Sequence, residues 1–209
     1  MLTMMVSVYV SNNCVAISNR WELYELALQT IMGRTDKGRA GLDQTLQETL
    51  LGHLQQLASA SHGREGERRV FTAAEASKWV GASSWLTIEE AMRAGRLPII
   101  AALGLNDKDE EEYRFGHMSY QEYLTGRGYY QKLSASRFST DVMVELFGRE
   151  PQHAFAEVKH HLMLQLLAGI LSPEERMACL AAMTGGRGEV LAITNKELGS
   201  AGAEALAPY

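Results

Sequence analysis

Helix-start signals recur along this chain, and they constrain its fold more than any other feature. Each consists of a hydroxyl or amide residue followed three positions later by glutamate, a spacing that satisfies free N–H groups in a helix's first turn. The pairs are Asn19–Glu22, Thr72–Glu75, Thr87–Glu90, Ser119–Glu122 and Ser172–Glu175. Because apolar residues follow them at helical spacing, the sequence predicts a mainly α-helical fold.

Apolar stripes at spacings of three and four give the expected helices their positions. The stripes are Trp21, Tyr24, Leu28 and Ile31; Leu46, Leu50, Leu54 and Leu57; Tyr120, Tyr123, Leu124 and Leu133; and Phe155, Val158, Leu162 and Leu166. Polar or glycine-rich stretches at 33–41 and 59–69 are predicted loops. The helix opened at Thr87 is expected to end near Gly95, and the one opened at Ser172 to end at Gly185.

The periodicity changes between residues 97 and 118. An apolar run, Leu97–Leu105, is followed by an acidic turn at 106–112 and by Tyr113–Met118, which alternates imperfectly. Two short runs around a turn predict a β-hairpin. Several helices, then a hairpin, then a helix is the order of a winged-helix module, and the same elements are compatible with other packings.

Composition sets the broad class of molecule. The chain has 209 residues, of which 46% are apolar, so it can bury a real core in about one to two domains. Its net charge of −5 argues against bulk electrostatic binding of nucleic acid. The apolar stretch Met1–Val10 has about half the length of a membrane span, so none is expected. Cys14 and Cys179 are compatible with a single disulfide, and two free thiols in a reducing, cytoplasmic location are the simpler interpretation.

Motifs that would indicate an enzyme or a metal centre are missing from the sequence. It contains no phosphate-binding G-x-x-x-x-G-K-[S/T], no C-x-x-C, no H-E-x-x-H and no G-x-S-x-G. His160 and His161 are adjacent, so on a helix their rings would point about 100° apart and would not share a metal. The acidic run at 107–112 lacks the glycine and the distal glutamate of a calcium loop, and is predicted to be a solvated hairpin tip.

His117 is the candidate site residue. It ends the predicted hairpin two residues before Ser119, the expected N-cap of the next helix. A helix N-terminus offers free N–H groups and the positive end of the helix dipole, which suits an anion. A histidine beside it can donate a ring N–H to a phosphate oxygen. The competing interpretation is an ordinary histidine without a ligand.

Residues 113–124, which read YRFGHMSYQEYL, resemble the winged-helix signature of NACHT-type STAND NTPases. That signature is aromatic-x-Phe-x-His-[Leu/Met]-[Ser/Thr]-[Phe/Tyr]-Gln-Glu-[Tyr/Phe]. The start of the chain, with NRWELYE at 19–25, resembles the first helical subdomain of that family. Residues 190–207 resemble a leucine-rich repeat of the ribonuclease-inhibitor type, with Lys196 in place of the ladder asparagine. The chain is thus similar to part of a NACHT–leucine-rich-repeat (NOD-like) receptor of innate immunity.

The resemblance implies a mainly α fold in four parts. These are the end of a first helical domain at 1–38, a winged-helix domain with a β-hairpin at 39–136, a second helical domain at 137–186, and a first, incomplete leucine-rich repeat at 187–209. The phosphate-binding loop and the magnesium-binding motif would then lie before Met1, and further repeats after Tyr209. The partners implied are that nucleotide-binding core and those repeats in the same parent chain, with oligomerisation on activation.

The family also implies roles for particular residues. His117 would contact the β-phosphate of ADP and help to hold the closed, inactive state, so that ADP or ATP with magnesium is a cofactor only together with the NTPase core. Ser119 would cap the following helix and Glu122 would complete its capping box. Aromatic residues of the signature are expected to form core: Tyr113, Phe115, Tyr120 and Tyr123.

These expectations describe a nucleotide-dependent signalling switch that has no enzymatic activity of its own. The alternative is a stand-alone winged-helix and helical module that binds proteins without nucleotide. A DNA-binding winged helix is disfavoured, because the expected recognition helix Thr87–Gly95 contains Glu89, Glu90 and only Arg93.

Overall fold

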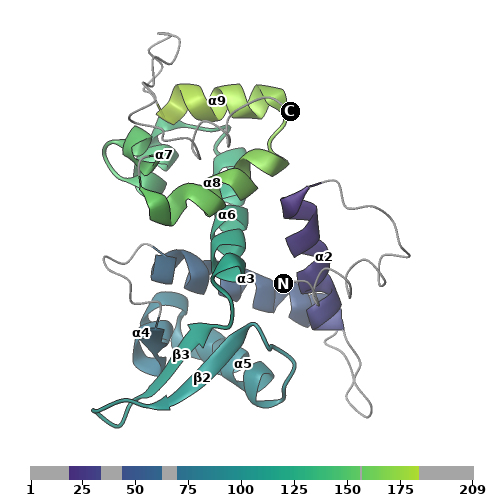
Figure 1. Ribbon diagram of the computed structural model, residues 1–209, viewed down its shortest axis with the longest axis vertical. Helices are drawn as coiled ribbons and strands as arrows, with labels where there is room; N and C mark the ends of the chain where they lie inside the picture. Colours follow the sequence, from purple (N-terminus) through teal and green to yellow (C-terminus); the bar gives the residue numbers. More distant parts are fainter. Residues whose placement is uncertain (1–18, 34–43, 63–69, 156, 184–209) are drawn as a thin grey trace. The chain divides into compact units, whose positions relative to one another are not determined.

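The computed structural model describes residues 19–33, 44–62, 70–155 and 157–183 (Figure 1). Its α-helices are α2 Arg20–Gly33, α3 Gln44–His62, α4 Ala73–Val80, α5 Ala82–Arg93, α6 Met118–Ala135, α7 Thr140–Phe147, α8 Val158–Ile170 and α9 Pro173–Met183. A 3-10 helix, η1, covers Pro151–Phe155. The strands are β1 Val70–Thr72, β2 Ile100–Leu105 and β3 Glu111–Phe115. The predicted mainly helical fold is confirmed for this part of the chain.

Some expectations fall outside the described residues. They concern the apolar stretch Met1–Val10, the thiol of Cys14, the end of the last helix at Gly185, and the repeat at 187–209. The chain divides into two compact units, unit 1 (Met1–Thr125) and unit 2 (Gly126–Tyr209). The division falls inside α6. Among the described residues, no helix combines the length and the apolar character that crossing a membrane requires.

Unit 1 is built on an antiparallel sheet in the order β1-β3-β2. Figure 1 shows α4 and α5 behind the β2–β3 hairpin, and α3 packs against both helices. Phe71 on β1 is at the centre of the core, with its ring near Trp79, Trp85, Tyr113 and Phe115. Of the stripe predicted on α3, Leu50, Leu54 and Leu57 are fully buried and Leu46 is half-buried.

The hairpin prediction is confirmed, but β1 was not foreseen. The Asn106 side chain closes the turn, accepting hydrogen bonds from the amides of Lys108 (2.8 Å) and Glu110 (3.0 Å). β1 is three residues long, and the only expectation for its residues was that Thr72 caps the next helix. It becomes a strand because Val70–Thr72 pair with 112–114 on β3, a long-range contact that local sequence does not encode.

Three predicted helix starts are correct. Thr72 and Glu75 form a complete capping box. The Thr72 hydroxyl accepts from the Glu75 amide at 3.2 Å, and the Glu75 carboxylate accepts from the Thr72 amide at 3.0 Å. Ser172 and Glu175 do the same at 3.2 and 2.8 Å, and α9 begins at Pro173. Asn19 accepts from the Glu22 amide at 2.9 Å.

The predicted helix start at Thr87 is wrong. Helix α5 begins at Ala82, because Gly81 adopts φ +89° and turns the chain between α4 and α5. Thr87 therefore lies inside the helix, where its hydroxyl donates to the Ser83 carbonyl at 3.0 Å. The end near Gly95 is correct. The predicted loop at 59–69 also begins too early, since α3 continues to His62.

Unit 2 has its own core, formed by the second half of α6 with α7, η1, α8 and α9. Its buried residues include Leu133, Met143, Met163, Leu167 and Cys179. The stripe expected from Phe155 to Leu166 is only partly correct. Phe155 belongs to η1 instead of α8, and Leu162 is half-buried whereas Leu166 is buried. The helix α7 was not predicted.

Candidate functional site

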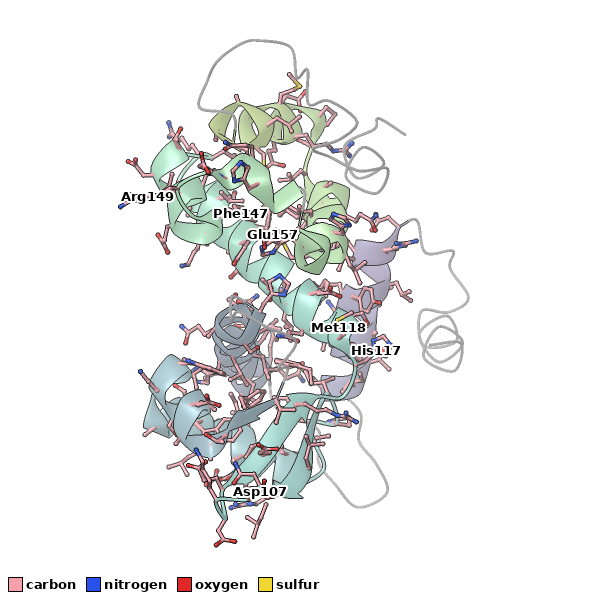
Figure 2. All side chains as sticks on the ribbon, turned by 60° about the vertical axis from the view of Figure 1, so that its left-hand side comes forward. Asp107, His117, Met118, Phe147, Arg149 and Glu157 are labelled. Atoms are coloured by element: carbon pink, nitrogen blue, oxygen red, sulfur yellow. The ribbon has the colours of Figure 1, made fainter. Side chains whose placement is uncertain are left out.

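His117 lies at the junction between β3 and α6, exposed to solvent (Figure 2). The junction is held by the Gly116 amide, which donates to the Ile99 carbonyl at 2.7 Å. The His117 carbonyl accepts from the Tyr120 amide at 3.1 Å, as the residue before a helix does. The hairpin and the helix thus both fix the backbone that carries the imidazole.

The prediction that Ser119 caps this helix is wrong, because the cap lies two residues earlier, at His117. Helix α6 begins at Met118, so Ser119 lies in its first turn and His117 occupies the cap position. The imidazole itself acts as the capping group, since Nδ1 accepts from the Ser119 amide at 3.2 Å. Glu122, predicted to complete a box with Ser119, is buried one turn further along, 4% exposed.

This geometry settles which ring nitrogen is available. A backbone amide can only donate, so Nδ1 of His117 carries the lone pair and the Ser119 hydroxyl, 2.6 Å away, donates to it as well. In the neutral ring the proton is then on Nε2. Nε2–H is consequently the donor that His117 can offer to an outside group.

Aromatic residues of the signature pack below this junction as predicted. Tyr113, Phe115, Tyr120 and Tyr123 are all at most 9% exposed. The Tyr123 ring lies 4.8 Å from that of Trp21 and 5.6 Å from that of Tyr24, both on α2. The Tyr123 hydroxyl donates to Glu25 on the same helix. This cluster joins α2 to the first turns of α6.

A second group of residues was missed by the sequence analysis. The Tyr113 hydroxyl lies 2.9 Å from Oε1 of Glu89 and 2.7 Å from Oε2 of Glu111, and Glu89 also pairs with Arg93 at 2.9 Å. Burial and these two carboxylates raise the pKa of Tyr113 far above its ordinary value. The period-two spacing of Glu111 and Tyr113 was a usable signal. The sequence carried no such signal for Glu89, because the direction of its side chain depends on where α5 begins.

Two other histidines pair with nearby carboxylates. His153 is 3.1 Å from Glu150, and the buried His160 is 3.5 Å from Glu157. The His160 ring also meets that of Phe147 edge-on, with centroids 6.2 Å apart; Figure 2 labels Phe147 and Glu157. Within the described ranges, no three His, Cys, Asp or Glu side chains gather in a way that could hold a metal ion.

Comparison of the chain with models of protein families, with curated proteins and with solved structures finds no match.

Proposed function

We propose that this chain is the regulatory part of a nucleotide-dependent signalling switch of the NACHT–leucine-rich-repeat type. The observation that carries the proposal is the arrangement of His117, whose Nδ1 is engaged by Ser119 while Nε2–H is left as an exposed donor at the start of α6. A fixed N–H donor beside a helix N-terminus suits a phosphate oxygen.

The order of elements in unit 1 supports a winged-helix assignment. The chain runs α3, β1, α4, α5, β2, β3, and the sheet has the order β1-β3-β2. Three helices interleaved with a small antiparallel sheet that ends in a hairpin are typical of winged-helix modules. In this proposal, β3 and α6 carry the family's histidine-containing signature.

The nucleotide supplies a β-phosphate, and the residues of this chain supply recognition. His117 donates a hydrogen bond to that phosphate, and the preceding hairpin and Ser119 hold its ring in one orientation. A charge-assisted hydrogen bond contributes about 1.5–3 kcal/mol, or about tenfold or more in the balance between two states. His117 thus favours the ADP-bound closed arrangement and takes no part in bond cleavage. The phosphate-binding loop and the magnesium ligands belong to a partner core in the same parent chain.

The test is the substitution His117→Ala in the parent protein that includes the nucleotide-binding core. We expect less co-purifying ADP, measured by chromatography after denaturation, and higher basal signalling. His153→Ala is the matched control, because His153 is an exposed histidine outside the site. Equal ADP occupancy in the two variants would refute the role of His117.

The alternative is a stand-alone module that binds proteins without nucleotide. The exposed side chains of Leu103 and Leu105 on β2 favour it, because they could contact a partner. Mapping the 5′ end of the transcript separates the two proposals. An in-frame phosphate-binding loop upstream of Met1 supports the switch, whereas transcription that starts just before Met1 supports the stand-alone module.

A further inference from the structure

The β2–β3 hairpin and α5 enclose a small pocket that the proposed nucleotide switch does not use. Its volume is about 160 Å³. Apolar groups and charged groups line it together: Glu89, Met92, Arg93, Ile100, Ala102, Glu111 and Tyr113. The pocket lies on the face of the sheet to which Tyr113 belongs and against which α5 packs.

The polar side of the pocket has more acceptors than donors. The Tyr113 hydroxyl has one proton and lies within hydrogen-bond distance of two carboxylates, those of Glu89 and Glu111. Arg93 neutralises Glu89, with its own side chain 69% exposed. Among the described residues, no cation pairs with Glu111. The single phenol proton satisfies one carboxylate at a time, so an incoming cationic N–H group could donate to the other, that of Glu111.

A β-bulge in β2 places an exposed apolar residue, Leu105, opposite Glu111. Ala102 pairs with Tyr113, but the register then shifts, so that Gly104 pairs with Glu112 and Leu105 with Glu111. Opposed residues of an antiparallel pair share one face, so Leu105 lies on the same face as Glu111 and Tyr113. Its side chain is 69% exposed. The surface thus offers an apolar contact next to a carboxylate.

We propose that this face of the hairpin docks an extended segment of a protein partner, which places a basic side chain in the pocket and an apolar one against Leu105. Charge complementarity selects this occupant. The hairpin turn at 106–112, where Figure 2 labels Asp107, carries five acidic residues against one lysine. A second copy would bring the same negative turn to the surface, and nucleic acid would bring phosphates, so both are repelled.

The spacing of the site defines a probe. Residues i and i+2 of an extended peptide share one face, as Glu111 and Tyr113 do on β3. The peptide acetyl-Ala-Leu-Ser-Arg-Ala-amide therefore presents leucine and arginine at the required separation. The same peptide with citrulline in place of arginine has nearly the same shape and no charge. Both are titrated into the ¹⁵N-labelled 209-residue chain, and amide shifts are followed by NMR.

We expect the arginine peptide to shift amides of β2, β3 and the second half of α5, with about tenfold weaker binding of the citrulline peptide. Glu111→Gln should weaken binding of the arginine peptide by a similar factor. Glu112→Gln is the matched control, because it removes the same charge from the adjacent residue on the opposite face. Leu105→Ser should weaken binding, whereas Leu86→Ser, at an exposed leucine of α5, should not.

Three outcomes would overturn the proposal. One is equal loss of binding in Glu111→Gln and Glu112→Gln, which would mean diffuse attraction to an acidic hairpin. Another is the absence of shifts around the pocket. The third is a change of oligomeric state in Leu105→Ser, measured by light scattering, which would identify a second copy as the occupant.

Discussion

Two threonines in this chain have the same local sequence signature and different structural roles, which allows a matched test. Thr72 and Thr87 are each followed three residues later by glutamate. In the structure Thr72 caps α4, whereas Thr87 lies inside α5 and donates to Ser83. We expect Thr72→Ala to destabilise unit 1 and Thr87→Ala to leave its stability nearly unchanged.

The magnitudes follow from the hydrogen bonds. Removing an N-cap threonine costs about 0.5–2 kcal/mol, because the amide at the third helical position loses its partner. Here that amide belongs to Glu75, and its bond to Thr72 is 3.2 Å long. Inside a helix, alanine is more favourable than threonine by up to about 0.7 kcal/mol, which offsets the loss of the bond from Thr87. The two variants should therefore differ by about 0.5–2 kcal/mol in the free energy of unfolding.

The assay is urea unfolding followed by tryptophan fluorescence. It reports on unit 1 alone, because the three tryptophans of the chain are Trp21, Trp79 and Trp85. The midpoint should fall for Thr72→Ala while the slope m stays constant. If Thr87→Ala lowered the midpoint as much as Thr72→Ala, the boundary of α5 and the reasoning on caps would both be refuted.

Two further predictions concern single buried groups. Tyr123→Phe keeps the aromatic packing but removes the hydrogen bond to Glu25, and should cost about 1.5 kcal/mol in the same fluorescence assay; an equal loss in a Glu25→Ala background, where the acceptor is absent, would contradict this coupling. Burial raises the pKa of the Cys179 thiol to about 12. At pH 8.5 iodoacetamide should therefore alkylate it roughly a thousandfold more slowly in the folded chain than in urea, because the thiolate fraction is lower by about that factor; mass spectrometry locates the modified residue. Because the unfolded thiol loses its proton from pH about 9 and the folded one keeps it until about 12, stability should fall across that interval. Rapid alkylation of the folded chain would show that the thiol is accessible.

The site could be predicted in part from the sequence. The position of His117 between a hairpin and a helix was correct, because both elements have strong local signals. Its role as the capping group was not predicted, since the expected cap was Ser119 and the helix begins two residues earlier than that cap implies, at Met118. Which ring nitrogen is free also depends on that placement. The pocket around Tyr113 required two elements distant in sequence to meet, so no local pattern could locate it.

Local physical chemistry was enough to determine the mainly helical fold, the β-hairpin and the capping boxes that begin at Thr72 and Ser172. The reason is that helix caps, turns and apolar periodicity act within a few residues. Tertiary structure decided the rest. β1 exists because β3 pairs with it. Leu105 lies on the same face as Glu111 and Tyr113 because a bulge shifts the register. Such features depend on contacts between distant residues, whose free energy exceeds the local preference of a short segment.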